Sequence, residues 1–324
     1  MSRSEPTARV PGTVTLAIFP DTQYYTVSRS SHLARQADWV VDHRAERDIR
    51  AVIHLGDITE HNSPKQWEFA RARLDRVARY LPLALATGNH DYGDGGSANR
   101  RVTLFIRYFG RPGPATRRAL VETLAPGDLT NAYYAIPLAG VQIGLLVLEW
   151  CPRRKTVGWA HRVLARHSRD RVIVVTHAYL YDDDTRYDAR RFGGAQRWNP
   201  RTYPLARAAL ESGQAHPDGA YDGEMLWQGL VRLYPNVFMT LNGHVNGDGT
   251  GYRISVGRDG NTVHQVLVNY QMLAEGGLGY LRLLEFDPDG ETLRMKTYSP
   301  SLDRWALARD QTFDVVIAPP LWVR

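Results

Sequence analysis

Six short apolar runs, each followed at once by polar residues, constrain this chain more than any other feature. Apolar runs of four to eight residues are typical of strands buried on both faces. Two amphipathic stretches with helical spacing separate the first three runs. Strands that alternate with helices predict a parallel or mixed sheet layered with helices. The six runs begin at Val14, Ala51, Leu81, Val141, Arg171 and Asn236.

The polar residues after these runs are expected to face one site, because ligands of such sheets bind where the carboxyl ends of the strands meet a crevice. Asp21 and Asn246 stand near the two ends of the series and would serve the same crevice. We therefore predict a short N-terminal tail, residues 1–12, and one domain over residues 13–324. Strand-like segments between His264 and Tyr298 are expected to extend a second sheet of that domain.

The second amphipathic stretch carries a helix start signal. Ser63 suits the N-cap and Pro64 suits the first helical position, so a helix is predicted to begin at Pro64.

Composition narrows the function classes. The chain has 324 residues, 43% hydrophobic and 23% charged, which excludes a disordered or fibrous protein. It has no apolar run of the roughly 20 residues that span a bilayer and no apolar N-terminal signal, and Cys151 is its only cysteine. We therefore expect a cytoplasmic protein without membrane contact. The net charge is +6, but the arginines are dispersed, so nucleic acid is a disfavoured partner.

The polar clusters supply carboxylate, amide and imidazole groups without a thiolate. Such groups suit Mn, Fe or Zn ions. Two metals about 3.5–4 Å apart could clamp a phosphoryl group and generate hydroxide. The residues of these clusters are Asp21, Gln23, Asp57, Asn89, His90, His177, His244 and Asn246.

Five motifs carry a resemblance to a known family. In chain order they read DTQYY, HLGDITEHN, TGNHDYG, VVTHAYL and LNGHVNG. The series resembles the calcineurin-like metallophosphoesterase superfamily, whose motifs run D-x-H, G-D, G-N-H-[DE], H and G-H-x-H. The resemblance implies an α/β fold, a layered αββα sandwich of two mixed β-sheets flanked by helices. It also implies metal-dependent hydrolysis of phosphate esters.

The same resemblance implies a role for each motif residue. Asp57 would bridge two divalent metal ions, and a hydroxide between them would attack phosphorus. His90 would be a general acid or a donor to the phosphoryl oxygen, with Asp91 orienting its ring. The implied ligands are Asp21, Gln23 and Asn246 at the first metal, and Asn89, His177 and His244 at the second.

Two positions depart from the family pattern. Gln23 and Asn246 stand where the family has histidines, and both fall on the first metal. That position becomes all oxygen, so manganese or iron is expected there rather than zinc.

The substrate is expected to be a small-molecule phosphate ester, and no protein partner is implied. Tyr25, His61 and Asn62 are candidate substrate contacts. An insertion at about residues 179–227 is either a lid or specificity loop, or a surface excursion with one short helix near Pro204–Ser212.

Three functions remain open from the sequence. A phosphodiesterase fits an open metal clamp with His90 as its acid. A phosphomonoesterase would want an arginine or lysine aimed into the cleft. A non-catalytic binding protein is the third, because the first metal position departs from the family pattern.

Overall fold

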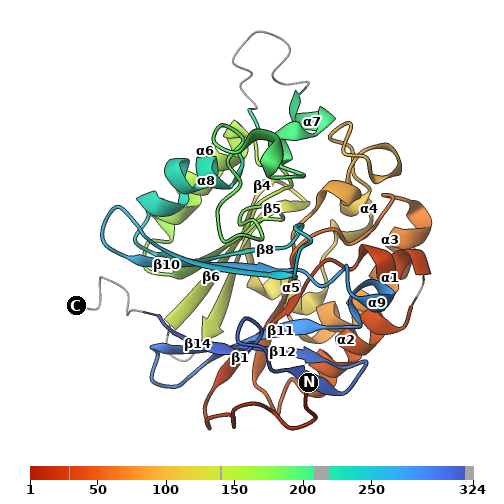
Figure 1. Ribbon diagram of the computed structural model, residues 1–324, viewed down its shortest axis with the longest axis vertical. Coiled ribbons are helices and arrows are strands. Elements are labelled where there is room, and N and C mark those ends of the chain that lie inside the picture. Colours follow the sequence, from red (N-terminus) through yellow and green to blue (C-terminus); the bar gives the residue numbers. More distant parts are fainter. Residues whose placement is uncertain (29, 139–140, 208–218, 318–324) are drawn as a thin grey trace.

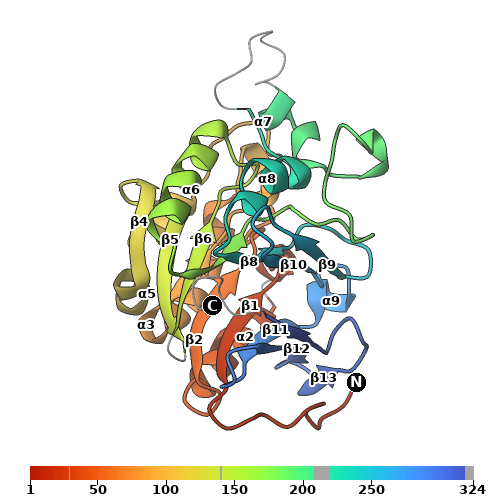
Figure 2. The same ribbon diagram turned by 90° about the vertical axis from the view of Figure 1, so that its left-hand side faces the viewer.

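The computed structural model of the protein describes residues 1–28, 30–138, 141–207 and 219–317. Two seven-stranded mixed sheets pack together, with α1, α2 and α3 on one side of the molecule and α6 and α8 on the other (Figures 1 and 2). The αββα sandwich expected from the sequence is confirmed.

The first sheet has the order β13-β12-β11-β1-β2-β3, with β14 beside β12. Its strands are β1 (Val14–Phe19), β2 (Ile49–His54), β3 (Leu83–Leu85), β11 (Leu281–Phe286), β12 (Thr292–Ser299), β13 (Arg304–Ala306) and β14 (Phe313–Val316). Strands β1, β2 and β3 are parallel, so their carboxyl ends share one edge.

The second sheet has the order β4-β5-β6-β7-β8-β10-β9. Its strands are β4 (Leu120–Ala125), β5 (Asp128–Leu138), β6 (Val141–Val147), β7 (Arg171–Val175), β8 (Val237–Asn242), β9 (Thr250–Val256) and β10 (Thr262–Val268). Strands β6, β7, β8 and β10 are parallel. All six apolar runs of the sequence are therefore strands.

The helices of the described residues are mostly short. They are α1 (Gln23–Ser28), α2 (His32–Asp42), α3 (Pro64–Tyr80), α4 (Phe105–Phe109), α5 (Pro114–Ala119), α6 (Arg154–Arg166), α7 (Pro204–Arg207), α8 (Gly223–Gly229) and α9 (Ala274–Gly277). Helix α3 begins at Pro64 as predicted, with Ser63 at the N-cap, although the Ser63 side chain forms no capping hydrogen bond. None of these helices combines the length and apolar character needed to cross a bilayer.

Three apolar clusters match the layers of the sandwich. One lies between the sheets, where Leu16 of β1 and Leu145 of β6 belong to the same cluster. A second lies under α6 and α8, and a third lies under α2 and α3. Because the strands are buried on both faces, their sequences are continuous apolar runs rather than alternating ones.

The late strands differ from the expectation that they extend a second sheet. Only β10 does so, beside β8. Strand β11 instead pairs antiparallel with β1, with Val14 opposite Phe286, and β12 follows β11 through a turn at 287–290. Strand β2 pairs with only one side of β1, and pairing with β11 provides hydrogen-bond partners for the backbone N–H and C=O groups on the other side.

The N-terminal segment is attached to the first sheet. Ser2 forms a β-bridge with Trp305. The carboxylate of Glu5 pairs with Arg47 at 2.8 Å and with Lys296 at 2.7 Å, and the fully buried Glu285 lies 2.8 Å from Lys296.

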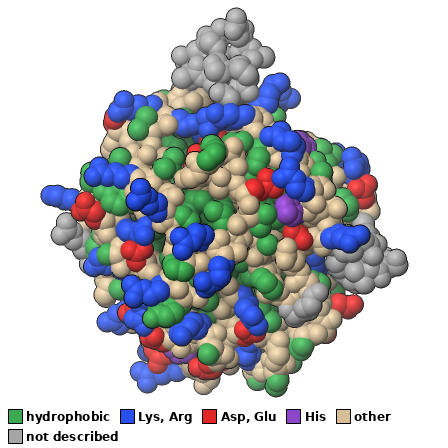
Figure 3. All heavy atoms as spheres, turned by 180° about the vertical axis from the view of Figure 1, so that it is seen from behind, with side chains coloured by type: hydrophobic (Ala, Val, Ile, Leu, Met, Phe, Trp, Pro, Cys, Tyr) green, Lys and Arg blue, Asp and Glu red, His purple; other side chains and the backbone are tan. Residues whose placement is uncertain are grey.

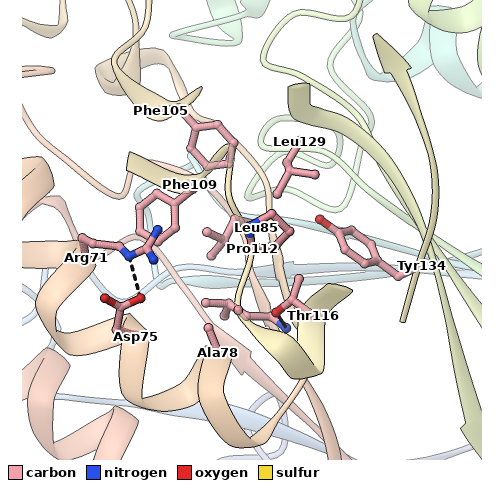
Figure 4. A pocket seen from close by; sticks show the side chains of 12 residues that line it. Arg71, Asp75, Ala78, Leu85, Phe105, Phe109, Pro112, Thr116, Leu129 and Tyr134 are labelled. Carbon is pink, nitrogen blue, oxygen red and sulfur yellow. Dashed lines mark hydrogen bonds and ion pairs between the residues drawn. The ribbon is translucent and has the colours of Figure 1, made fainter. Parts of the chain in front are cut away.

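A small cavity of about 20 Å³ lies beneath α3, α4 and α5 (Figure 4). Leu85, Phe109 and Leu129 line it, and Tyr134 points into it. It has room for about one water molecule. On the face of the molecule opposite Figure 1, Lys and Arg side chains are scattered among hydrophobic and acidic ones rather than gathered in one block (Figure 3).

Candidate active site

Three buried side chains from three strand ends meet at one point. Asp57 follows β2, His177 follows β7 and His244 follows β8, so each sheet contributes. One potential ligand atom from each lies within 4.8 Å of the other two. A carboxylate and two imidazoles at this separation could hold a divalent metal ion.

Hydrogen bonds orient both imidazoles. His177 donates from Nδ1 to the Leu55 carbonyl at 2.8 Å, so its Nε2, 3.1 Å from Asp57 Oδ2, faces the cluster. His244 donates from Nε2 to the Trp198 carbonyl at 2.8 Å, which leaves Nδ1 available. In each ring, one nitrogen donates a hydrogen bond to a backbone carbonyl, and the other nitrogen faces the cluster. Histidines that bind metals in proteins are commonly held in this way.

Asp57 is nearly inaccessible to solvent. Its Oδ1 accepts a hydrogen bond of 2.9 Å from the His90 backbone N–H. Burial alone would raise the pKa of Asp57, but the positive charges of His177 and His90 outweigh it and hold the pKa below its usual value. The carboxylate is therefore ionised and can serve as an anionic ligand.

Asp21 reaches the same edge from β1. Its Oδ2 accepts hydrogen bonds from the His244 backbone N–H at 3.0 Å and from Asn269 Nδ2 at 3.1 Å. Burial and the neighbouring charge of Asp57 raise its pKa to about 8, although His177 opposes them. Two carboxylates that repel one another in a buried site would be stabilised by a cation.

Two buried amide oxygens of the site have no hydrogen-bond partner among the described residues. They are Gln23 Oε1 and Asn89 Oδ1. Buried acceptors without donors are costly, and most proteins satisfy them. Both belong to residues that the family resemblance predicts as metal ligands, and a cation would satisfy these two oxygens.

Two glycines allow the carboxylates to lie against the backbone. A Cβ at Gly88 would stand 2.1 Å from Asp57 Oδ1, and a Cβ at Gly243 would stand 2.0 Å from Asp21 Oδ1. Both distances are far below van der Waals contact, so the glycines of the G-N-H and G-H motifs make room for the carboxylates.

His90 is oriented by Glu60 rather than by Asp91. Its Nδ1 donates to the Glu60 carbonyl at 3.0 Å and lies 3.7 Å from the Glu60 carboxylate. Burial lowers the pKa of His90, but the charges of Asp57 and Glu60 outweigh it and raise the pKa. The His90 side chain is 31% exposed, so its Nε2 edge can meet a substrate.

The hydrogen bonds of Asp91 differ from those expected. It is fully buried and accepts hydrogen bonds from the backbone N–H groups of Gly88, Ile58 and Thr59 and from the Thr59 hydroxyl. The prediction that Asp91 orients the His90 ring is wrong, because its two oxygens are committed to these loops, although its charge is among those that raise the pKa of His90. Asp91 holds the Asp57 loop against the Asn89 loop.

Two of the candidate substrate contacts are structural. The Tyr25 hydroxyl is buried and accepts from the Gly279 backbone N–H at 2.9 Å. The Asn62 carboxamide bonds Trp67 Nε1 and three backbone groups. Both predictions are wrong for this reason, whereas His61 is exposed and stays a prediction.

Tyr24, the neighbour of Tyr25 in the chain, is influenced by the charges of the site. Its side chain is partly exposed. Burial, followed by the charges of Glu60, Asp57 and Asp21, raises the pKa of Tyr24.

The described part of the insertion packs on the second sheet and reaches the site. Tyr187 is buried in the cluster under α6 and α8. The Trp198 carbonyl holds His244, and the Tyr203 ring lies 5.2 Å from Trp150 and 6.2 Å from His244. The expected short helix is described only as α7, Pro204–Arg207, and residues 208–212 lie outside the described residues.

Sequence reasoning missed three residues. Glu60 contacts His90, Asn269 contacts Asp21, and Gln271 donates from Nε2 to Asn246 Oδ1 at 2.6 Å. Glu60 stands in the quoted G-D stretch, and the other two directly follow the apolar run of β10. All three residues follow the end of a strand, and this position in the sequence could have identified them as site residues.

The amino-acid sequence of this chain also matches the sequence profile of a known protein family. The profile described as calcineurin-like phosphoesterase matches residues 14–203, more than half of the chain. The chain belongs to the calcineurin-like phosphoesterase family. The matched segment includes Asp21, Asp57, Asn89 and His177, while His244 lies beyond it.

One relative extends the comparison by sequence. An uncharacterized protein of Bacillus subtilis (strain 168), YvnB, is 28% identical over 295 residues, which cover 86% of this chain and 19% of YvnB. This calcineurin-like phosphoesterase chain thus spans about a fifth of the relative that it matches.

One solved structure, with a TM-score of 0.50, shares its fold, and a second is similar to this chain. GAP50 of Plasmodium, titled the anchor in the inner membrane complex, is 11% identical with a TM-score of 0.50, over 95% of this chain and 90% of that one. A 5'-nucleotidase precursor from Thermus thermophilus is 16% identical with a TM-score of 0.45, over 94% and 55% of the two chains.

Proposed function

We propose that this chain hydrolyses phosphodiesters with the help of two divalent metal ions. Asp57 would be shared between the two metal positions. The other proposed residues are Asp21, Gln23 and Asn246 at the first position, and Asn89, His177 and His244 at the second. The first set offers only oxygen atoms from its side chains, which favours manganese or iron over zinc there.

The unpartnered atoms support this assignment. Gln23 Oε1 and Asn89 Oδ1 are buried and lack protein donors among the described residues, and His177 Nε2 faces the Asp57 carboxylate at 3.1 Å. Bound metals would polarise the phosphoryl oxygens and make a water molecule nucleophilic near neutral pH.

His90 supplies the proton for the leaving oxygen. Its Nδ1 is committed to the Glu60 carbonyl, so Nε2 is the nitrogen that can face substrate. The Glu60 carboxylate, 3.7 Å from Nδ1, stabilises the protonated ring. A positioned imidazole of this kind typically contributes roughly 10²–10⁴-fold to a rate.

The charge distribution around the cluster supports a diester over a monoester. The strongest charge effects on Asp21, Asp57 and His90 come from histidines and carboxylates, not from arginine or lysine. In the insertion, Arg186 is paired with Glu224 at 2.6 Å. A diester carries one negative charge and needs less cationic support than a monoester dianion.

The test compares a bis-aryl phosphate diester with the matching aryl monoester. Metal-free protein, prepared by chelation, receives manganese, iron, zinc or no metal. We expect metal-restored hydrolysis that favours the diester. A preference for the monoester would favour the phosphomonoesterase. Failure on both esters with every metal, in protein shown to be folded, would favour the non-catalytic binding protein.

A further inference from the structure

The loop after β10 brings two polar side chains to the first metal position, although no motif includes them. Asn269 donates from Nδ2 to Asp21 Oδ2 at 3.1 Å. Gln271 donates from Nε2 to Asn246 Oδ1 at 2.6 Å. The Asn269 Oδ1 accepts from the Gln271 backbone N–H at 3.0 Å, which ties the two residues together. Each side chain therefore contacts a proposed ligand of the first metal.

The side-chain carbonyl oxygen of Gln271, Oε1, has no hydrogen-bond donor among the described residues. This oxygen is buried, and the residue as a whole is 6% exposed. Gln23 Oε1 is in the same condition and belongs to the same proposed metal position. A buried carbonyl oxygen without a donor is unfavourable, and a cation would satisfy it.

We propose that Gln271 is a further ligand of the first metal, through Oε1, while its Nε2 orients Asn246. The inference rests on the proposed function, because it requires a metal at the position of Asp21, Gln23 and Asn246. The carboxamide of Gln271 then compensates for the two missing histidines. Carbonyl oxygens are hard donors, so the added ligand favours Mn²⁺ over Zn²⁺ at this position.

A narrower role is that Gln271 only orients Asn246. Two substitutions separate the roles, because Gln271→Leu removes both polar atoms whereas Gln271→Glu keeps an oxygen and loses the Nε2 donor. A ligand role predicts that Glu substitutes for Gln and Leu does not. An orienting role predicts that both variants weaken the first metal alike.

The chain offers a matched control in Gln36. It is fully buried on α2, donates from Nε2 to the Tyr280 carbonyl at 2.7 Å, and has an Oε1 without a partner among the described residues. Its bonding pattern matches that of Gln271, but its donor goes to the backbone and not to Asn246. Gln36→Leu should leave metal binding unchanged.

The experiment is calorimetric titration of the metal-free full chain with Mn²⁺ and, separately, Zn²⁺. His177→Ala serves as the background, because it removes a ligand of the second position and leaves the first to be measured. We expect Gln271→Leu to weaken Mn²⁺ binding at least about 10-fold and Gln271→Glu to match or exceed the parent. Thermal melting identifies any variant that fails to fold.

Two results would overturn the inference: Mn²⁺ affinity unchanged in Gln271→Leu, or equally weak binding in the Leu and Glu variants. Hydrolysis does not enter this measurement. A parent chain that binds Mn²⁺ through Gln271 but cleaves neither ester would therefore defeat the proposed function while the ligand role of Gln271 stands.

Discussion

The imidazole of His90 lies against Glu60, with Nδ1 3.0 Å from the Glu60 carbonyl oxygen and 3.7 Å from its carboxylate. The two residues come from adjacent loops, after β3 and after β2. Glu60 follows Asp57 by three residues, and the left-handed backbone of Asp57, with φ near 48°, turns the chain between them. One loop thus supplies both a proposed metal ligand and the partner of the acid.

Glu60→Gln tests this pairing. The carboxamide cannot stabilise protonated His90, so turnover of a diester with a poor alcohol leaving group should fall about 10- to 100-fold. A nitrophenyl diester, whose leaving group needs no proton, should lose much less. Rates measured on both substrates check the difference, with exposed Glu68→Gln as the control. An equal loss on both substrates would contradict a role through His90.

His177→Ala should lose the metal at the second position and nearly all turnover. The Ala side chain offers no nitrogen, whereas wild-type Nε2 faces Asp57 at 3.1 Å. Metal analysis after dialysis measures the loss directly. His161→Ala, on α6, is the matched control. Unchanged metal content in His177→Ala would remove this residue from the ligand set.

Gly88→Ala should displace Asp57. The new Cβ would stand 2.1 Å from Asp57 Oδ1, so the carboxylate must move and metal affinity should fall at least about 10-fold. Gly158→Ala on α6 is the control, since nothing lies within 4 Å of its Cβ position. It should raise stability by about 0.5–1 kcal/mol. Titration with Mn²⁺ and urea unfolding compare the two variants.

Asp91→Asn should destabilise the fold. An asparagine offers one acceptor oxygen where Asp91 accepts from Gly88, Ile58 and Thr59, so at least one buried N–H loses its partner. We expect a loss of about 2 kcal/mol in the free energy of unfolding, measured with urea. If stability were unchanged while only substrates with poor leaving groups suffered, Asp91 would act on His90 after all.

Acid should weaken the fold through His264. Burial lowers its pKa to about 4, against about 6.5 in the unfolded chain. Between these values the unfolded chain binds the proton and the folded chain does not, so stability falls as pH drops from about 6.5 to about 4. The slope is at most about 1.4 kcal/mol per pH unit. His264→Gln should show a shallower dependence in urea unfolding at several pH values, and an identical dependence would contradict the assignment.

The strand ends were predictable because polar residues follow each parallel strand at its carboxyl end, and the carboxyl ends of both sheets contribute to the site. Asp57 and His177, 120 residues apart, needed only the apolar run before each of them. Long-range pairing was not predictable in this way. Strand β11 joins β1 rather than the second sheet, and an apolar run does not specify which open strand edge it will pair with.

Side-chain partners within the loops were the other limit. Asp91 stands beside His90 in the chain, yet its oxygens turn to the Asp57 loop, whereas Glu60 reaches His90 from another loop. Neighbours in sequence share a backbone but need not face one another. Gln271 belongs to no motif, so only the folded chain brings it to Asn246.

The bond from His244 Nε2 goes to the backbone carbonyl of Trp198 and not to a side chain. Every residue type has that oxygen, and the left-handed backbone of Trp198, with φ near 59°, is the main restriction on what can stand there. A change in the number of residues between Tyr179 and Trp198, in contrast, would move the oxygen away. Among homologues that keep this arrangement, the spacing of the segment should therefore be preserved more strictly than its amino acids, and deletions there should be selected against even where substitutions are free.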